Sequence, residues 1–196
     1  MHPPLADTAL DQLFRSARSL HAFTTDPVTD ETLKALYDLL KWGPTAFNAQ
    51  PARYLFLRSA EAKARLAPAL MASNLKKSLA APVTVIIAQD LDFPNHLPAQ
   101  YPAFNAKPMY DADPALTEVT AFRNSTLQGA YLLLAARALG LSVGPMSGFD
   151  AAKLDAEFFP GGRVRSNFIA NMGYGDLAKA PPRGPRLAFG EVAQIL

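Results

Sequence analysis

The 196-residue sequence contains no cysteine, which excludes disulfides, thiolate catalysis, iron–sulfur clusters and cysteine-ligated zinc. Histidine is scarce as well: His2, His21 and His96 are the only ones, and they lie far apart. No two of them have the i, i+4 spacing of a helical zinc site. The sequence therefore predicts neither a metal centre nor chemistry that needs a cysteine nucleophile.

The sequence also lacks a dominant charge and a long apolar run. Its 19 basic and 17 acidic residues give a net charge of +2, and no basic run of the kind that neutralises a phosphate backbone occurs. The most apolar stretch, 125–136, ends at Arg137 and is shorter than the ~20 residues of a membrane span. Asp7 and Asp11 interrupt any signal-peptide pattern. We expect a cytoplasmic protein that binds neither nucleic acid nor membrane.

Several motifs that would identify a known active site are missing. The glycines at 140–148 and 173–175 do not have the spacing of a dinucleotide-binding loop, and neither a phosphate loop nor a nucleophile elbow is present. Asp90 and Asp92 form a close carboxylate pair after a strand-like segment. Acid–base work is one interpretation, but we favour strand-end turn chemistry.

What is present is the pattern of one globular domain, residues 1–196. Hydrophobic residues make up 49% of the chain, enough for a packed core, and neither repeats nor a linker divide it. Two helices precede the first strand, which favours an α+β fold over a doubly wound sheet. Asp7 and Asp30 are expected helix caps. We expect helices at 7–14, 30–40, 59–70, 75–79, 116–139 and 154–159, and strands at 53–58, 83–88 and 167–172.

Prolines interrupt residues 92–115 at positions 94, 98, 102, 108 and 114. This density predicts an irregular segment without helices. Such a segment in a compact domain is either a functional lid or an ordered surface excursion, and the sequence leaves both open. The helix that follows, 116–139, is apolar around much of its circumference and ends at Gly140. One domain of this size seldom encloses such a helix, so burial against a second copy is expected. The apolar end of the chain, 192–196, likewise needs a sheet edge or groove to cover it.

Four blocks of the chain, taken in order, resemble the nitroreductase family of flavoproteins. They are KWGPTAFNAQPAR at 41–53, EVTAFRNS at 118–125, LGLSVGPMSGFD at 139–150 and SNFIANMGYGD at 166–176. The similarity extends from about Leu13 to Leu196 and is closest to the malonic semialdehyde (3-hydroxypropionate-forming) reductases of pyrimidine breakdown. It implies a mixed sheet flanked by helices, in an intertwined homodimer with two FMN sites at the subunit interface.

The resemblance also implies which residues hold the FMN phosphate. Arg18, Ser19 and His21 match the first phosphate-binding segment, and Arg183 and Arg186 match basic residues of the tail. Arginine suits this role because its guanidinium forms bidentate bonds with a phosphate dianion. His21 stands where the family has Arg or Lys, so it is a weaker ligand near neutral pH, and a structural role is equally open.

The resemblance implies that residues from two subunits surround the flavin ring. Asn74 and Lys77 match the pair that reaches the ribityl chain and the pyrimidine edge, where a cation tunes cofactor electronics. From the same subunit, a turn along the ring is matched by Pro145, Met146, Ser147 and Gly148. From the other subunit, the matching residues are Pro44, Thr45, Ala46, Asn48 and Asn124. Many relatives have Glu in place of Ser147, so this pocket is less acidic, which fits the semialdehyde-reductase branch.

The expected activity is ping-pong hydride transfer from NADH or NADPH through flavin N5 to malonic semialdehyde. The cofactor carries this chemistry, so no catalytic side chain is assigned. Arg123 and Lys107 are candidates to orient the carboxylate of the acceptor. One alternative is a broad nitro or quinone reductase, and another is a flavin-free binding protein on the same fold.

Overall fold

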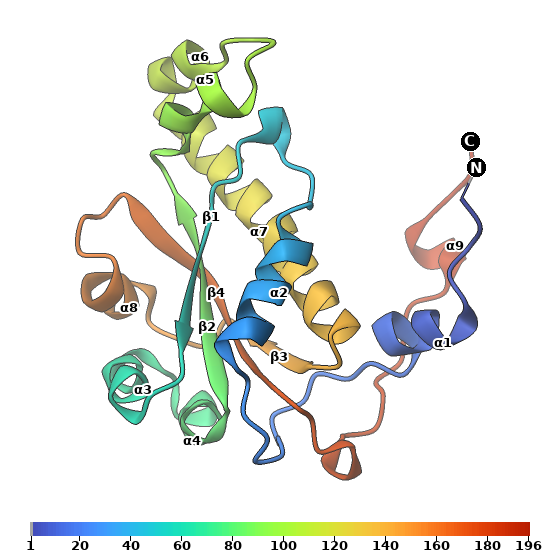
Figure 1. Ribbon diagram of the computed structural model, residues 1–196. Helices are drawn as coiled ribbons and strands as arrows, with labels where there is room; N and C mark the ends of the chain where they lie inside the picture. Colours follow the sequence, from blue (N-terminus) through green and yellow to red (C-terminus); the bar gives the residue numbers. More distant parts are fainter. Residues whose placement is uncertain (1) are drawn as a thin grey trace.

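The computed structural model describes residues 2–196 and builds them around an antiparallel sheet (Figure 1). The sheet has four strands in the order β1-β2-β4-β3. Its strands are β1 Ala52–Leu57, β2 Val83–Asp90, β3 Ser142–Met146 and β4 Val164–Gly173. The α-helices are α1 Asp7–Leu10, α2 Asp30–Leu40, α3 Ala60–Leu66, α4 Ala72–Ala80, α5 Leu97–Gln100, α6 Lys107–Ala112, α7 Pro114–Ala138, α8 Ala151–Phe158 and α9 Phe189–Val192. The predicted α+β class is confirmed, with parallel pairing in the described chain limited to a bridge between Ser19 and Val143.

Helices cover both faces of this sheet, so that the domain has three layers (Figure 1). On one face, Val85 and Ile87 of β2 pack against α2 and α7. On the other face, Ile86 packs with Leu66 of α3 and Leu154 of α8. Every residue of β2 is buried, because the strand lies between two neighbours and two helical layers. The run of β-branched residues at 83–88 thus marks a central strand, as predicted.

The prediction that residues 92–115 contain no helix is wrong. A 3₁₀ turn at Phe93–His96 leads into α5, and α6 and α7 follow. Prolines occupy the first turn of each of these four elements, where a missing N–H breaks no helical hydrogen bond. The segment forms its own small core at one end of the sheet, around Phe93 and Tyr110. It is an ordered excursion rather than an irregular loop.

The observed helix boundaries can be compared with the predicted capping residues. The predicted caps Asp7 and Asp30 are instead the first residues of α1 and α2, and Thr29 caps α2 by accepting a hydrogen bond from the Thr32 N–H. A hydroxyl one residue earlier takes the capping role that the aspartate was assigned. Gly140 does end α7 as predicted, with a φ of +78° that a glycine adopts without strain.

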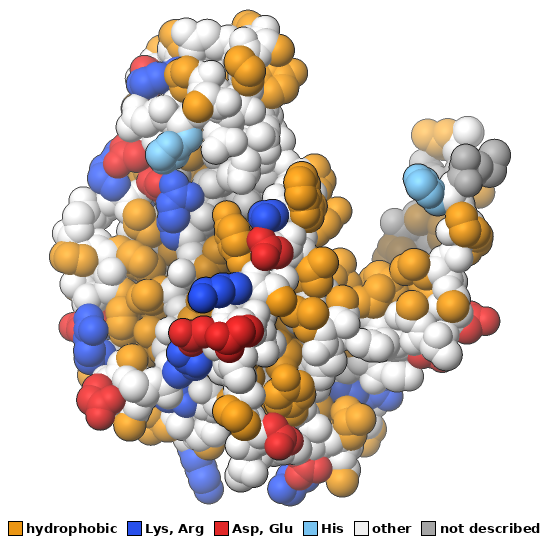
Figure 2. Space-filling model, in the orientation of Figure 1, with side chains coloured by type: hydrophobic (Ala, Val, Ile, Leu, Met, Phe, Trp, Pro, Cys, Tyr) orange, Lys and Arg blue, Asp and Glu red, His pale blue; other side chains and the backbone are white. Residues whose placement is uncertain are grey.

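The two ends of the chain form an arm beside the sheet layers (Figure 1). Helix α1 continues into a π-helical turn, Asp11–Arg15, and the C-terminal segment with α9 runs along the same side. Figure 2 shows an open recess between this arm and the body, with apolar side chains on both sides of it. Over residues 2–196 we find no helix long and apolar enough to cross a membrane. The same residues hold no cluster of His, Asp and Glu side chains suited to a metal ion.

Candidate functional site

The N-terminal segment that follows the arm runs along the outer edge of β3. Ser19 forms a parallel bridge with Val143, and the backbone oxygen of Leu20 lies against Gly144. A Cβ atom on Gly144 would lie 2.3 Å from that oxygen and 2.6 Å from Nδ1 of His21. Glycine at position 144 therefore permits the close approach that brings the Arg18–Ser19 segment beside the strand.

Beyond β3, the turn at Ser147 and Gly148 meets the start of α4. The side chain of Asn74 donates a hydrogen bond of 2.8 Å to the Gly148 carbonyl, and the Met71 N–H donates to the same oxygen at 3.1 Å. A Cβ atom on Gly148 would lie 2.5 Å from Nδ2 of Asn74. The turn and α4 thus fit together through the absence of a side chain at position 148. We call the set Asn74, Lys77 and 144–148 the ring-side cradle.

His21 lies at the junction between this cradle and the N-terminal segment. Burial, and then the positive charge of Lys77, lower the pKa of His21. Its Nδ1 atom is buried without a hydrogen-bond partner among the described residues. A neutral imidazole packed on Gly144 is a poor ligand for a phosphate dianion. The structure thereby favours the structural role that the sequence left open for His21.

A pocket of about 400 Å³ lies between the N-terminal segment and the C-terminal arm. Four arginines line it, and no acidic residue does: Arg18, Arg137, Arg183 and Arg186. Arg183 donates to the Arg15 carbonyl and, at 2.8 Å, to the Ala17 carbonyl. Within the described chain none of the four forms an ion pair. This uncompensated positive charge is what a bound anion would neutralise.

Sequence reasoning missed Arg137 as a member of this pocket. The sequence identifies Arg137 only as the residue that ends an apolar stretch. In the structure it lies in the last turn of α7, facing the N-terminal segment. The sequence signal for such a role is a lone arginine next to a long apolar stretch of a helix. Such a residue is costly to bury and usually has an assigned partner.

The predicted flavin-flanking residues 44–48 lie elsewhere, near α5 and α6 (Figure 1). They belong to the loop 44–50, which contains three non-glycine residues with positive φ: Phe47 at 50°, Asn48 at 51° and Gln50 at 45°. We call 44–50 the strained loop. Each such conformation costs about 1–3 kcal/mol and persists only where the surroundings hold it. Strain of this kind is common at binding sites, which makes this loop a candidate binding element.

Buried amides hold the strained loop in place. Oδ1 of Asn124 on α7 accepts a hydrogen bond of 2.8 Å from the Ala46 N–H, while its Nδ2 donates to the Thr120 carbonyl. Oε1 of Gln128, one turn further, accepts from the Ala52 N–H at 2.9 Å. The amide of Asn124 thus makes one accepted and one donated hydrogen bond within the chain, and it positions the Ala46 backbone.

The proline-rich excursion braces the same loop from the other side. The Phe47 ring packs against three aromatic rings of the excursion, with ring centroids 5.5–6.5 Å apart. Asn48 Nδ2 donates to the Gln100 carbonyl at 3.1 Å, and Gln50 donates to the Gln100 side chain at 3.1 Å. The excursion and the loop therefore form one packed unit.

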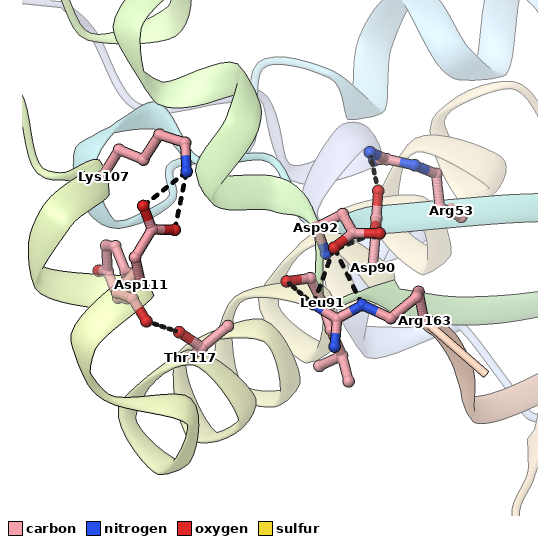
Figure 3. Close-up of polar contacts among 9 residues, drawn as sticks. Arg53, Asp90, Leu91, Asp92, Lys107, Asp111, Thr117 and Arg163 are labelled. Atoms are coloured by element: carbon pink, nitrogen blue, oxygen red, sulfur yellow. Dashed lines mark hydrogen bonds and ion pairs between the residues drawn. The ribbon is translucent and has the colours of Figure 1, made fainter. Parts of the chain in front are cut away.

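Figure 3 shows that Asp90 and Asp92 are both neutralised by arginines. Arg53 lies 2.5 Å from a carboxylate oxygen of Asp90, and Arg163 lies 2.7 Å from Asp92. The other oxygen of Asp90 accepts a hydrogen bond from the Asp92 N–H at 2.8 Å, which closes a turn at the end of β2. The strand-end interpretation is confirmed, and these carboxylates are not available as an acid–base pair.

The structure thus gathers the predicted site residues into two groups. One group combines the ring-side cradle with the arginine pocket, through Arg18 and Ser19. The other is the strained loop with Asn124, towards the α5 and α6 end of the sheet (Figure 1). Within one chain, the two groups do not form a single site.

Known sequences match this chain both as a family and as individual proteins. The profile described as "Nitroreductase family" matches residues 14–162. A Burkholderia lata protein named "Putative NADH dehydrogenase/NAD(P)H nitroreductase" is 58% identical over 191 residues, which cover 97% of this chain and 98% of that protein. A Rhodopseudomonas palustris protein of the same name is 56% identical over 196 residues, covering 100% of both chains.

Solved structures resemble the fold at lower sequence identity. One from Exiguobacterium sibiricum, described as a "putative nitroreductase in complex with FMN", has a TM-score of 0.84 at 21% identity and covers 100% of both chains. An enone reductase of gut-bacterial fatty acid saturation has a TM-score of 0.84 at 22% identity, covering 98% of this chain and 100% of that one. At these identities the likeness shows the fold.

Proposed function

The chain belongs to the nitroreductase family, and we propose that it is a single-domain, FMN-dependent NAD(P)H oxidoreductase. The observation that carries this proposal is the arginine pocket without acidic residues, adjoining a ring-side cradle shaped by two glycines. A phosphate dianion matches the arginine pocket in charge. The FMN-bound structural neighbour and the names of the close relatives support the same cofactor and cosubstrate.

The residues present match the chemical groups of FMN. Arg18, Arg183 and Arg186 would hold the phosphate, and Ser19 would add a hydroxyl beside them. Lys77 would place a positive charge at the pyrimidine edge of the ring, where it favours electron uptake. Bound FMN would supply hydride transfer between NAD(P)H and an acceptor. The residues of the chain would hold and orient the cofactor for this transfer.

We further propose a homodimer, because the strained loop of one chain cannot complete the cradle of the same chain. Helix α7 exposes four large apolar side chains that a second copy could cover: Val119, Phe122, Leu127 and Tyr131. Trp42, next to the strained loop, is 78% exposed. Burial of this surface brings 44–48 of one subunit towards the cradle of the other, as the family resemblance implies.

The C-terminal end of the chain gives this dimer a second contact. Ile195 and Leu196 are fully exposed on the arm. A groove of about 570 Å³ between α2 and the unpaired edge of β1 is lined mainly by apolar surface, including Leu33, Tyr54 and Phe56. We propose that the end of the partner's chain fills it. Deletion of residues 193–196 should shift the mass in analytical ultracentrifugation towards the monomer, and an unchanged dimer would contradict this contact.

For the acceptor we propose malonic semialdehyde, in pyrimidine breakdown in the cytoplasm, as the resemblance to the semialdehyde-reductase branch implies. Of the two candidate cations for its carboxylate, the structure favours Arg123. Lys107 bonds to both carboxylate oxygens of Asp111, at 2.6 and 2.8 Å (Figure 3). Arg123 is exposed on α7 beside Asn124, and its guanidinium makes no ion pair or hydrogen bond with the described part of the chain.

A second candidate acceptor is a planar nitroaromatic or quinone. Tyr101 and Phe104 are 37% and 54% exposed beside Phe47, an aromatic surface on which a flat molecule could stack. Steady-state rates with malonic semialdehyde, a quinone and a nitrofuran decide between the two. We expect the protein to reduce malonic semialdehyde. We expect Arg123→Gln to lose this activity because its KM for malonic semialdehyde is raised. Rates on nitrofuran with none on semialdehyde would contradict the specific assignment.

A further inference from the structure

Arg137 lies where two adjoining pockets meet. It lines the arginine pocket together with Arg18 and Arg186, and it also lines a smaller space of about 170 Å³ against Gly140 and Ser142. Its position is fixed, because Nη1 donates a hydrogen bond of 3.0 Å to the Leu13 carbonyl. Its Nε atom is buried and has no hydrogen-bond partner in the described chain. A guanidinium held rigidly with an unused donor is prepared to bind an acceptor.

The chain itself supplies no anion for this group. Around the pocket, the acceptors of the arginines are backbone carbonyls, those of Leu13, Arg15 and Ala17 among them. Carbonyl dipoles carry only partial charge, so four formal positive charges stay close together. Burial, and then the charge of Arg183, lower the pKa of Arg137, a sign that the site disfavours a further cation as it stands. A dianion would relieve this repulsion.

We propose that Arg137 is a phosphate-binding residue of the FMN site, together with Arg18, Arg183 and Arg186. This inference rests on the proposed function and names a ligand that sequence reasoning did not assign. Arg18 and Ser19 belong to the N-terminal segment, and Arg183 and Arg186 to the exposed arm. Arg137 is the one member from the packed helix α7, so it contributes a guanidinium from the body of the domain, opposite the arginines of the two chain ends.

A purely structural role for Arg137 predicts different behaviour. In that case Arg137 only ties the N-terminal segment to α7, as Gln12 does from the other side by donating to the Arg137 carbonyl at 2.7 Å. Loss of either tie would then loosen the segment that carries Arg18 and Ser19, so Arg137→Gln and Gln12→Ala would weaken FMN binding by similar factors. If Arg137 binds the phosphate itself, Arg137→Gln loses more FMN affinity than Gln12→Ala does, while riboflavin, which lacks the phosphate, is affected little.

The test titrates full-length, flavin-stripped protein with FMN and with riboflavin, and follows the quenching of flavin fluorescence. For Arg137→Gln we expect the FMN dissociation constant to rise about 10- to 100-fold, the loss of one charge-assisted hydrogen bond. The riboflavin constant should stay within about threefold of wild type. Arg137→Lys keeps the positive charge but lacks the forked donors of a guanidinium. It should therefore bind FMN more tightly than Arg137→Gln and less tightly than the wild type. The structural control, Gln12→Ala, should raise the FMN dissociation constant by less than Arg137→Gln does, because it removes a tie of the segment but no phosphate ligand.

The outcomes separate this assignment from the function on which it rests. An Arg137→Gln variant that keeps the wild-type ratio of FMN to riboflavin affinity overturns the role of Arg137, while the proposed cofactor stands. A wild-type protein that binds neither flavin overturns the proposed function and this assignment together. A selective loss of FMN affinity that exceeds the loss in Gln12→Ala supports the role of Arg137, and one that is no larger than in Gln12→Ala overturns it.

Discussion

A methyl group added at Gly148 tests the ring-side cradle directly. The new Cβ would lie 2.5 Å from Nδ2 of Asn74 and 3.2 Å from the sulfur of Met71, so the amide has to move. That movement breaks the 2.8 Å hydrogen bond to the Gly148 carbonyl. Overpacking costs about 1–3 kcal/mol and the lost hydrogen bond about 1 kcal/mol. We expect Gly148→Ala to lower the free energy of unfolding by about 2–4 kcal/mol.

Urea unfolding followed by circular dichroism measures this difference, and flavin titration measures its effect on the site. Gly161→Ala is the matched control, because nothing lies within 4 Å of a Cβ there and its backbone is outside the left-handed region. The control should leave stability unchanged or raise it by about 0.4–1 kcal/mol. If Gly148→Ala matched this control in both stability and FMN affinity, the steric reasoning for the cradle would be refuted.

Three further changes test the surroundings of the site. Asn124→Ala removes the acceptor of the Ala46 N–H, so the free energy of unfolding should fall by about 1–3 kcal/mol; an unchanged urea midpoint would show that this bond does not hold the loop. Asp90→Asn leaves Arg53 with a neutral partner, and we expect a loss of about 1–3 kcal/mol, reduced from that of a dry pair because the arginine is 36% exposed; salt titration of the same variant checks the charge dependence. Burial lowers the pKa of His21, so the unfolded chain binds the proton more tightly and stability should fall as pH drops below about 6.5. His21→Asn should weaken this fall, and identical pH profiles of the urea midpoint would exclude the residue as its source.

The fold follows from local patterns wherever one principle dominates. The run at 83–88 is a central strand because continuous β-branched residues need two covered faces. The prediction that residues 92–115 contain no helix was wrong because it rested on the number of prolines and not on their positions within the helical elements. At the first turn of a helix a proline breaks no helical hydrogen bond, and each helical element of this segment has one in its first turn.

The site was predictable as a set of motifs but not as a geometry. Arg18, Arg183 and Arg186 converge because the chain ends meet, which no local pattern encodes. The role of Arg137 depends on where α7 ends relative to the N-terminal segment, a tertiary relation invisible in composition. Asn124 is predicted beside the cofactor from the resemblance alone, and the hydrogen bond of its buried amide to the Ala46 backbone is seen only in the folded chain. Such contacts join residues 78 positions apart, and only the folded chain reveals them.

The central claim is that this chain is a flavoprotein whose cofactor exchanges electrons with a nicotinamide. The most direct measurement is the visible absorbance spectrum of the purified protein, recorded anaerobically before and after addition of NADH or NADPH. The account predicts bound FMN at one molecule per chain, with the flavin bands bleached by at least one of the two cosubstrates. A protein that stays colourless after incubation with FMN, or a bound flavin that neither nicotinamide reduces, would contradict it.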